Sequence, residues 1–278
     1  MTDADGGGEE DEGLALGAIF TDPPRPPSPE PTIAVYENIV NFEDSPSPSP
    51  WSTISVRLVG NHPLWGHHLW NAARALAGFL QRSPELYLDR NVLELGAGGG
   101  LPGLLTAKCG ARKVVLTDYP DKALLDNLTY NVAQNLNVQP PPGCPCPATA
   151  TVCSVLGYVW GSPVDPLLDA LLPVPDTGPA GTSFDLILLS DLIFNHSQHR
   201  ALLTTCERTI APGGCVLVFY THHRPHLAAR DMDFFKMAAE TSWKCEEVLT
   251  ERFPPMFPED SGEEEVRSTV HGWKLTRV

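Results

Sequence analysis

A short apolar segment that runs directly into a glycine-rich turn constrains the fold of this chain more than any other feature. The segment Asn91-Val92-Leu93-Glu94-Leu95 is followed by Gly96-Ala97-Gly98-Gly99-Gly100 and then by a stretch, 101–108, with helical composition. Glycines let a backbone turn tightly and approach a ligand more closely than a Cβ atom permits. A strand, a glycine turn and a helix in this order predict a ligand site at the end of the strand.

A second apolar run, 113–117, ends at Asp118, roughly twenty residues beyond the glycines. An acid at this position is suited to accept hydrogen bonds from the ribose hydroxyls of a nucleotide cofactor. The glycines and Asp118 together predict a cofactor cradle. The structural alternative is a glycine-rich turn beside a surface aspartate.

The rest of the chain continues the alternation of strands and helices. Helices are predicted at 63–82, 121–136, 198–210 and 224–241, and further strands at 150–156, 184–189, 215–220, 244–251 and 266–276. This order predicts an α/β fold with a doubly wound, mostly parallel seven-stranded sheet. The last two strands are predicted to pair as an antiparallel hairpin at one edge.

Proline and charge divide the chain into segments, since many of its 28 prolines lie in clusters. Residues 1–31 are acidic and then proline-rich, which predicts a disordered tail, and 32–57 are interpreted as an N-terminal arm with a Ser/Pro linker. A single catalytic domain is expected at 58–278. Two proline-rich insertions are predicted in it, near 138–148 and 161–183.

Charge and composition exclude several classes of partner. The formal net charge of -15 argues against binding to nucleic acid or to anionic lipid. No apolar run reaches the ~18 residues that span a bilayer, so we expect no membrane partner and a soluble, cytoplasmic protein. The seven cysteines contain no CxxC pair and the histidines no HExxH spacing, so no metal site is expected.

Two cofactors are compatible with the cradle. Gly98, Gly100 and Gly103 nominally match the dinucleotide fingerprint, so NAD must be weighed against S-adenosyl-L-methionine. Glu94 favours the methyl donor, because a carboxylate expected beside the cofactor would repel a pyrophosphate but tolerate a sulfonium. The position of the turn also favours the methyl donor, because the turn begins at Gly96, whereas the match to the dinucleotide fingerprint begins two residues later, at Gly98.

Five stretches make the chain resemble the class I, seven-stranded methyltransferases, and more closely a fungal branch that acts on elongation factor 1-alpha. They are Leu58-Val59-Gly60-Asn61-His62-Pro63-Leu64-Trp65-Gly66-His67, residues 91–102, Thr117-Asp118-Tyr119-Pro120-Asp121, Tyr158-Val159-Trp160-Gly161 and Ser190-Asp191-Leu192-Ile193-Phe194-Asn195-His196. The resemblance implies a protein methyltransferase that modifies the N-terminal glycine of elongation factor 1-alpha and the lysine next to it. Relatives were formerly described as nicotinamide N-methyltransferases.

The resemblance also implies roles for particular residues. Cofactor contacts are implied at Trp65, Gly96, Ala97, Gly98, Asp118, Trp160 and Ser190, to which the charge argument adds Glu94. Asp191 and Phe194 match the Asp-x-x-Phe or Tyr motif of the protein-methylating enzymes, and Asn195 is a further candidate for holding the substrate amine.

Each of these side chains has a structural alternative. Trp160 can be a core tryptophan, Trp65 can pack as a hydrophobic staple before a helix, and Asp191 or Asn195 can cap a helix. The histidines at 196, 199, 222, 223 and 226 are interpreted as neutral surface residues. Three other functions stay open: a methyltransferase for a small pyridine such as nicotinamide, an NAD-dependent oxidoreductase, and a non-catalytic binding module.

Overall fold

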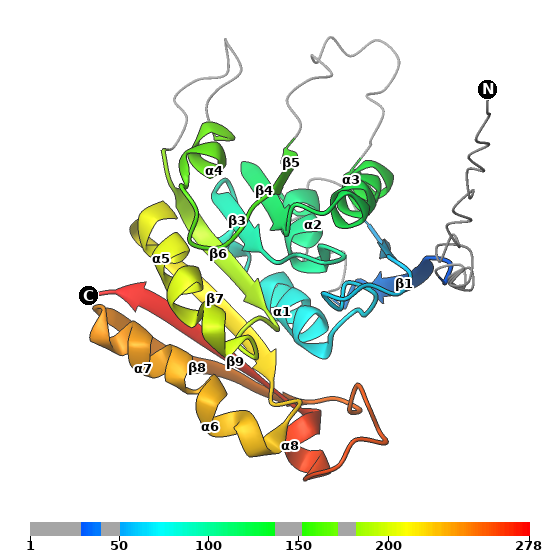
Figure 1. The fold of residues 1–278 in the computed structure, drawn as a ribbon. Coiled ribbons are helices and arrows are strands. Elements are labelled where there is room, and N and C mark those ends of the chain that lie inside the picture. Colours follow the sequence, from blue (N-terminus) through cyan, green and yellow to red (C-terminus); the bar gives the residue numbers. More distant parts are fainter. Residues whose placement is uncertain (1–28, 40–50, 137–151, 172–181) are drawn as a thin grey trace, which may run out of the picture.

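The computed structural model describes residues 29–39, 51–136, 152–171 and 182–278, whose helices and strands are drawn in Figure 1. In chain order these elements, with η for 3-10 helices, are β1 (Thr32–Glu37), β2 (Thr53–Leu58), α1 (Asn71–Arg82), η3 (Pro84–Leu86), β3 (Asn91–Leu95), α2 (Leu101–Lys108), β4 (Lys113–Asp118), α3 (Lys122–Leu136), β5 (Cys153–Gly157), α4 (Asp165–Asp169), β6 (Phe184–Ser190), η4 (His196–Gln198), α5 (His199–Thr209), β7 (Ile210–Thr221), η5 (Pro225–Leu227), α6 (Ala228–Asp231), α7 (Asp233–Glu240), β8 (Trp243–Arg252), α8 (Glu264–Ser268) and β9 (Thr269–Arg277).

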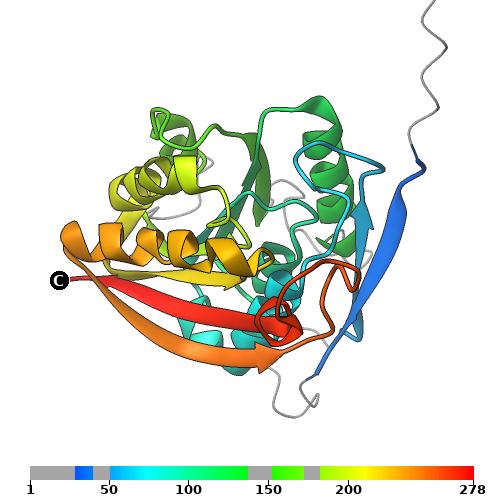
Figure 2. The same ribbon diagram turned by 60° about the horizontal axis from the view of Figure 1, so that its bottom comes forward.

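The main sheet has seven strands in the order β5-β4-β3-β6-β7-β9-β8. Adjacent strands from β5 to β7 are parallel, and β9 runs antiparallel to both β7 and β8. Figure 2 shows β8 at the outer edge with β9 beside it, so the predicted antiparallel edge pair is confirmed. Strand order reverses between β3 and β6, the point where sheets of this type bind ligands.

Both faces of the sheet are covered by helices, which explains the continuous apolar sequences of its central strands. Val92 of β3 and Leu186 of β6 pack into one core together with α1, α2 and α3. The next residues, Leu93 and Ile187, pack into a second core with α4, α5 and α7. The doubly wound, mostly parallel fold predicted from the sequence is confirmed.

A small two-stranded sheet formed by β1 and β2 lies against α3 through hydrogen bonds from asparagine side chains. Asn127, Asn131 and Asn135, spaced four residues apart, occupy one face of α3. Asn131 accepts from the backbone N–H of Arg57 and donates to its carbonyl, and Asn135 does the same with Ser55. The free edge of β2 is therefore paired by helix side chains in place of a further strand.

Local expectations differ from the structure in several places. Residues 53–57, predicted to belong to the N-terminal arm and linker, form most of the strand β2. The helix expected to begin near Pro63 begins at Asn71, because Trp65 has a φ of 61° that a helix does not allow. The single helix expected over 224–241 is divided into η5, α6 and α7, and β9 begins at Thr269, after the short helix α8.

Several predictions fall wholly or partly on segments that the structure does not describe. The expected disordered tail lies outside the described residues up to 28, and so do 40–50 of the expected linker and the insertion at 138–148. Of the second insertion, the described part contains α4, whose Leu167 is buried. Within the described ranges, no helix is long and apolar enough to cross a bilayer.

Candidate active site

A cavity of about 430 Å³ lies at the carboxyl ends of β3, β4 and β6. Its walls include ten of the eleven side chains and turn residues that the sequence indicated, all except Glu94: Trp65, Gly96, Ala97, Gly98, Asp118, Trp160, Ser190, Asp191, Phe194 and Asn195. These residues come from segments far apart in the chain, and the parallel strands bring them to one edge of the sheet. Their location is as expected, and the roles given to them remain predictions.

The glycine turn after β3 has a backbone that side chains would disturb. Gly96, Gly98 and Gly100 have φ values of 60°, 54° and 77°, in the left-handed region. A Cβ atom on Gly96 would lie 2.7 Å from Leu192 Cδ2, whereas a Cβ atom on Gly98 would meet nothing within 4 Å. Gly98 therefore presents bare backbone to the open cavity, as a site for close approach of a ligand requires.

Asp118 fixes this turn. One carboxylate oxygen, Oδ2, accepts a hydrogen bond of 2.7 Å from the Gly98 N–H, and Oδ1 accepts one of the same length from the N–H of Tyr119. Burial raises the pKa of Asp118, while these two hydrogen bonds oppose the rise. An ionised carboxylate has about four acceptor positions. Asp118 can therefore hold the turn and still accept hydrogen bonds from a ligand in the cavity.

The structure does not place Glu94 beside the cavity. Its carboxyl group is fully buried under the turn, where Oε2 accepts a hydrogen bond of 2.8 Å from the N–H of Gly103 and Oε1 has no partner among the described residues. Burial raises the pKa of Glu94 to about 8, opposed by the Gly103 hydrogen bond and assisted by the charge of Asp118. The expectation of a charged carboxylate next to the cofactor is therefore wrong, because this carboxyl is buried and predominantly neutral near pH 7.

Gly103, the third glycine of the nominal dinucleotide fingerprint, has a packing role. A Cβ atom at this position of α2 would lie 2.2 Å from Leu116 Cδ2 and 2.6 Å from Glu94 Oε2. Only glycine lets α2 approach β3 and β4 this closely. Close packing of the helix on the strands accounts for this glycine, and because either cofactor is compatible with such packing, Gly103 does not distinguish between them.

Ser190 at the end of β6 and Trp160 shortly after β5 also line the cavity. The Ser190 hydroxyl is buried and has no hydrogen-bond partner among the described residues, which leaves an acceptor and a donor available at the cavity wall. The Trp160 ring borders the turn, since its Cζ2 atom lies 3.1 Å from the position of a Cβ atom on Gly96. Trp160 packs on the core with one part of its ring and faces the cavity with another.

Asp191 follows the last residue of β6 in a conformation that few residues adopt. Its φ is 57° and its side chain is buried. Aspartate and asparagine tolerate the left-handed region better than other residues with a Cβ atom. Asp191 Oδ2 lies 3.0 Å from His223 Nε2, and Oδ1 accepts a long hydrogen bond of 3.3 Å from the N–H of Thr221. The carboxylate is thus held at the cavity, and it caps no helix.

Asn195 also does not cap a helix through its side chain. It occupies the N-cap position of η4, but no side-chain capping hydrogen bond is formed, and its Oδ1 atom accepts from the Ser197 hydroxyl at 3.0 Å. Phe194 is 48% exposed, which is high for a phenylalanine, and it lies at the wall of the cavity. The turn after β6 therefore presents Asp191, Phe194 and Asn195 together.

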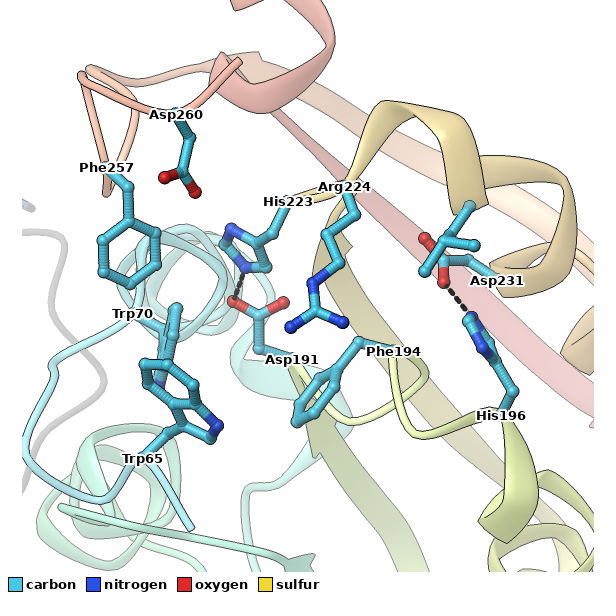
Figure 3. A pocket seen from close by; sticks show the side chains of 11 residues that line it. Trp65, Trp70, Asp191, Phe194, His196, His223, Arg224, Asp231, Phe257 and Asp260 are labelled. Carbon is cyan, nitrogen blue, oxygen red and sulfur yellow. Dashed lines mark hydrogen bonds and ion pairs between the residues drawn. The ribbon is translucent and has the colours of Figure 1, made fainter. Parts of the chain in front are cut away.

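A second, smaller cavity of about 120 Å³ adjoins the first (Figure 3). The two share the walls formed by Trp65, Trp70, Asp191 and Phe194. The remaining walls come from η4, from the residues that follow β7, from η5 and α6, and from the loop between β8 and α8 that carries Phe257. We call these the cofactor cavity and the acceptor cavity, and Asp191 lies at their junction.

The histidines of this region are embedded in hydrogen bonds, and the expectation that they lie at the surface is wrong for all but His226. Burial lowers the pKa of His199, in agreement with the expected neutral form. His196 Nε2 and His222 Nδ1 each lie 2.6 Å from an oxygen of buried Asp231, and His199 Nε2 lies 2.6 Å from the Ile193 carbonyl. For His223, burial favours the neutral form, but the charge of Asp191 and the hydrogen bond to it outweigh burial and raise the pKa.

Several residues of the acceptor cavity were not predicted from the sequence. His223 stands just past the end of β7, so the rule that strand ends carry function could have indicated it. Trp70, Phe257 and Asp260 lie in the acceptor cavity without any local motif. Their place depends on how distant segments pack, which no short pattern in the sequence records.

The arrangement has the parts that transfer of a small group between two bound molecules requires. One ligand can bind along the glycine turn, and a second can enter the acceptor cavity past Asp191. The acceptor cavity combines aromatic rings with carboxylates, a combination that suits a cationic amine. Proximity of two bound reactants supplies much of the rate in such a reaction.

Comparison with known proteins identifies the class. Residues 59–241 match the family described as Lysine methyltransferase, and the chain belongs to this family. The expectation of a methyltransferase, in preference to an oxidoreductase, is confirmed.

Two proteins that are similar in sequence to this chain come from fungi. The chain is 42% identical to a protein N-terminal and lysine N-methyltransferase of Cryptococcus neoformans, over 98% of this chain and 92% of the relative. It is 41% identical to a protein of the same description from Schizosaccharomyces pombe, over 93% of this chain and 94% of the relative. The solved structure of the YcgJ protein from Bacillus subtilis is similar in fold, with a TM-score of 0.51 at 14% identity, covering 73% of this chain and 98% of that one.

Proposed function

We propose that the protein transfers methyl groups from S-adenosyl-L-methionine to the N-terminal glycine of elongation factor 1-alpha and to the lysine next to it. The observation that carries this proposal is the position of Asp191 at the junction of the cofactor and acceptor cavities. The names of the fungal relatives, which describe methylation of protein N-termini and lysines, support the same two kinds of acceptor.

The residues of the cofactor cavity fit S-adenosyl-L-methionine. Bare backbone at Gly98 leaves room for close approach, Asp118 has acceptor positions for hydroxyl groups, and the buried Ser190 hydroxyl lacks a partner among the described residues. The volume of about 430 Å³ is within the range of cavities that hold ligands of this size. When bound, the sulfonium of this cofactor supplies an electrophilic methyl group.

The acceptor must present a neutral amine, because only the lone pair can attack a methyl carbon. An α-amine has an ordinary pKa of about 7.7–8.0 and is partly neutral at pH 7, whereas a lysine amine near 10.4 needs more assistance. Asp191 would accept a hydrogen bond from the amine and orient it, although its charge also favours the protonated form. Orientation and exclusion of water by Trp65, Phe194 and Phe257 are then the main contributions of the protein.

Further expectations follow for the partner and for the place of action. The net charge of -15 suits a basic protein surface better than nucleic acid or an anionic membrane. Elongation factor 1-alpha acts in the cytoplasm, and we propose the same location for this protein.

The experiment that tests the proposal uses the full chain, methyl-labelled S-adenosyl-L-methionine and recombinant elongation factor 1-alpha with a free N-terminus. Mass spectrometry of the first tryptic peptide should find methyl groups on the N-terminal nitrogen and on the adjacent lysine. Nicotinamide is offered in a parallel reaction. Transfer to nicotinamide without transfer to the protein would overturn the proposal and favour a small-molecule acceptor.

A further inference from the structure

Of the three carboxylates that line the acceptor cavity, one has no side-chain partner among the described residues. Asp191 is held by His223, and both oxygens of Asp231 are held by His196 and His222. Asp260 also lines this cavity, and its side chain makes no hydrogen bond or ion pair with the described part of the chain. Figure 3 shows its carboxylate directed into the cavity, above His223 and beside Phe257.

Aromatic rings surround the space in front of Asp260. The Phe257 ring lies 6.0 Å from Trp70, 6.2 Å from Trp65 and 6.4 Å from His223 between ring centroids, each in a nearly perpendicular arrangement. In such an edge-to-face pair the edge of one ring covers one face of the other, and the opposite face can still contact a ligand. A carboxylate next to aromatic faces is the chemistry that binds an ammonium group, whether or not it carries methyl groups.

The loop that carries Phe257 and Asp260 is fixed at several points. The Phe257 carbonyl accepts hydrogen bonds from Arg267 Nη1 at 2.7 Å and from the Asp260 N–H at 3.2 Å. Asn71 at the start of α1 donates to the Pro254 carbonyl at 2.8 Å, which ties the loop to α1. Asp260 is therefore presented in a defined position although it is exposed at the mouth of the cavity.

On the side of Asp191 away from Asp260, the cavity is lined by a positive charge. The Arg224 guanidinium lies near Asp191 and Phe194 in Figure 3, on the side away from Asp260. It would repel a second ammonium group there and is suited to donate to peptide carbonyls. Within the acceptor cavity, the side bounded by Phe257 and Asp260 is thus the favourable place for a second cation.

We infer that Asp260 and Phe257 form a second ammonium site, which binds the amine of the substrate that is not receiving a methyl group. The inference rests on the proposed function, in which two neighbouring amines of one polypeptide are both acceptors. While the α-amine lies at Asp191, the side-chain ammonium of the second residue lies at Asp260, and the flexible lysine stem allows the exchange. Asp260 is then a specificity-determining residue and touches no reacting atom.

The test is equilibrium binding of two peptides to the full-length protein in the presence of S-adenosylhomocysteine, measured by calorimetry. One peptide begins Gly-Lys, and the other has uncharged norleucine in place of lysine. Asp260→Asn should weaken binding of the Gly-Lys peptide about fivefold, as expected for a partly exposed charge pair with an aromatic contribution. It should leave binding of the norleucine peptide unchanged.

The matched control is Glu259→Gln, which removes the neighbouring exposed acid that does not line the cavity and should change neither affinity. Asp260→Lys should in turn prefer a Gly-Glu peptide. Equal effects of Asp260→Asn on both peptides, or no effect on either, would overturn the inference. Methyl transfer to the same peptides is measured separately, so that binding without any transfer would count against the proposed function alone.

Discussion

The cofactor cavity and the acceptor cavity are built in different ways. Around the glycine turn, bare backbone of one continuous segment, 96–100, forms part of the ligand site, and Asp118 holds this turn through the Gly98 N–H. Around Asp191, the site is made of side chains from the segments near 65, 191, 223 and 257, held by buried histidine and carboxylate pairs. A backbone site leaves a short sequence motif, whereas a side-chain site assembled by packing does not.

The two cavities also differ in how readily amino-acid substitutions can change them. The cofactor cavity is fixed by glycine conformations and close packing, as at Gly103, where any side chain would collide with Leu116. The acceptor cavity can change its specificity by single substitutions on loops, since Phe257 and Asp260 belong to no strand or long helix. The comparison predicts that substitutions in the two cavities have separable effects on cofactor binding and on methyl transfer.

The largest effect is expected for Asp191→Asn. Asparagine tolerates the φ of 57° at this position, so the backbone should persist while the charge that orients the amine is lost. The kcat/KM for the protein acceptor should fall about 100-fold to 1000-fold, with the Kd for S-adenosyl-L-methionine unchanged. Asp233→Asn, at an exposed ion pair with Lys236, is the control. If Asp191→Asn weakened cofactor binding as strongly as it lowered kcat/KM, the two cavities would not have separate functions.

The next effect concerns stability under the cofactor cavity. Since the folded chain raises the pKa of Glu94 from 4.5 to about 8, it binds that proton more tightly than the unfolded chain does. This contribution to stability is complete below pH 4.5 and is lost as the pH rises toward 8. Glu94→Gln removes the dependence and should be more stable than the native chain at pH 8 by about 4 kcal/mol.

Denaturant unfolding of both proteins between pH 5 and pH 8, at intervals of about one pH unit, measures this difference. Cofactor affinity should be the same in Glu94→Gln, because the carboxyl does not line the cavity. If the free energy of unfolding changed with pH in the same way for both proteins, Glu94 would be ionised in the folded chain. The carboxyl under the turn would then be charged.

Asp118→Asn should weaken cofactor binding and little else. The amide oxygen can still accept from the Gly98 N–H, whereas the amide nitrogen cannot accept from the N–H of Tyr119, and hydrogen bonds from cofactor hydroxyls to a charged acceptor are lost. A loss of about 2 kcal/mol corresponds to a Kd raised about 30-fold. Calorimetric titration checks this, with Asp126→Asn on the exposed face of α3 as control. An unchanged Kd would remove Asp118 from the cofactor site.

The smallest effect is expected in the pH dependence of the acceptor cavity. Since the pKa of His223 is raised above 6.5 by Asp191, protonated His223 occupies the carboxylate at low pH and competes with a substrate ammonium. The KM for a Gly-Lys peptide should therefore fall between pH 6 and pH 8 in the native chain. In His223→Gln the corresponding decrease should be about threefold smaller. Identical pH profiles would show that His223 does not compete with the amine.

Much of the cofactor cavity was predictable and much of the acceptor cavity was not, for physical reasons. Continuous apolar strands and the turn at Gly96 indicate the fold because local conformation and burial determine them. The error at Glu94 arose because sequence places this residue at the turn but does not show whether it points into the cavity or under it. Strand β2 was missed because its edge is paired by asparagines of α3, a contact between segments about 70 residues apart.

The separation of the two cavities is tested most directly by combining Asp118→Asn with Asp191→Asn. Initial rates of methyl transfer are measured for the native chain, both single variants and the double variant, at concentrations of cofactor and peptide well below saturation. If one cavity binds the cofactor and the other orients the amine, the two losses in transition-state free energy should add to within about 0.5 kcal/mol. A double variant no slower than the worse single variant would show that the two carboxylates act as one unit and would contradict this account.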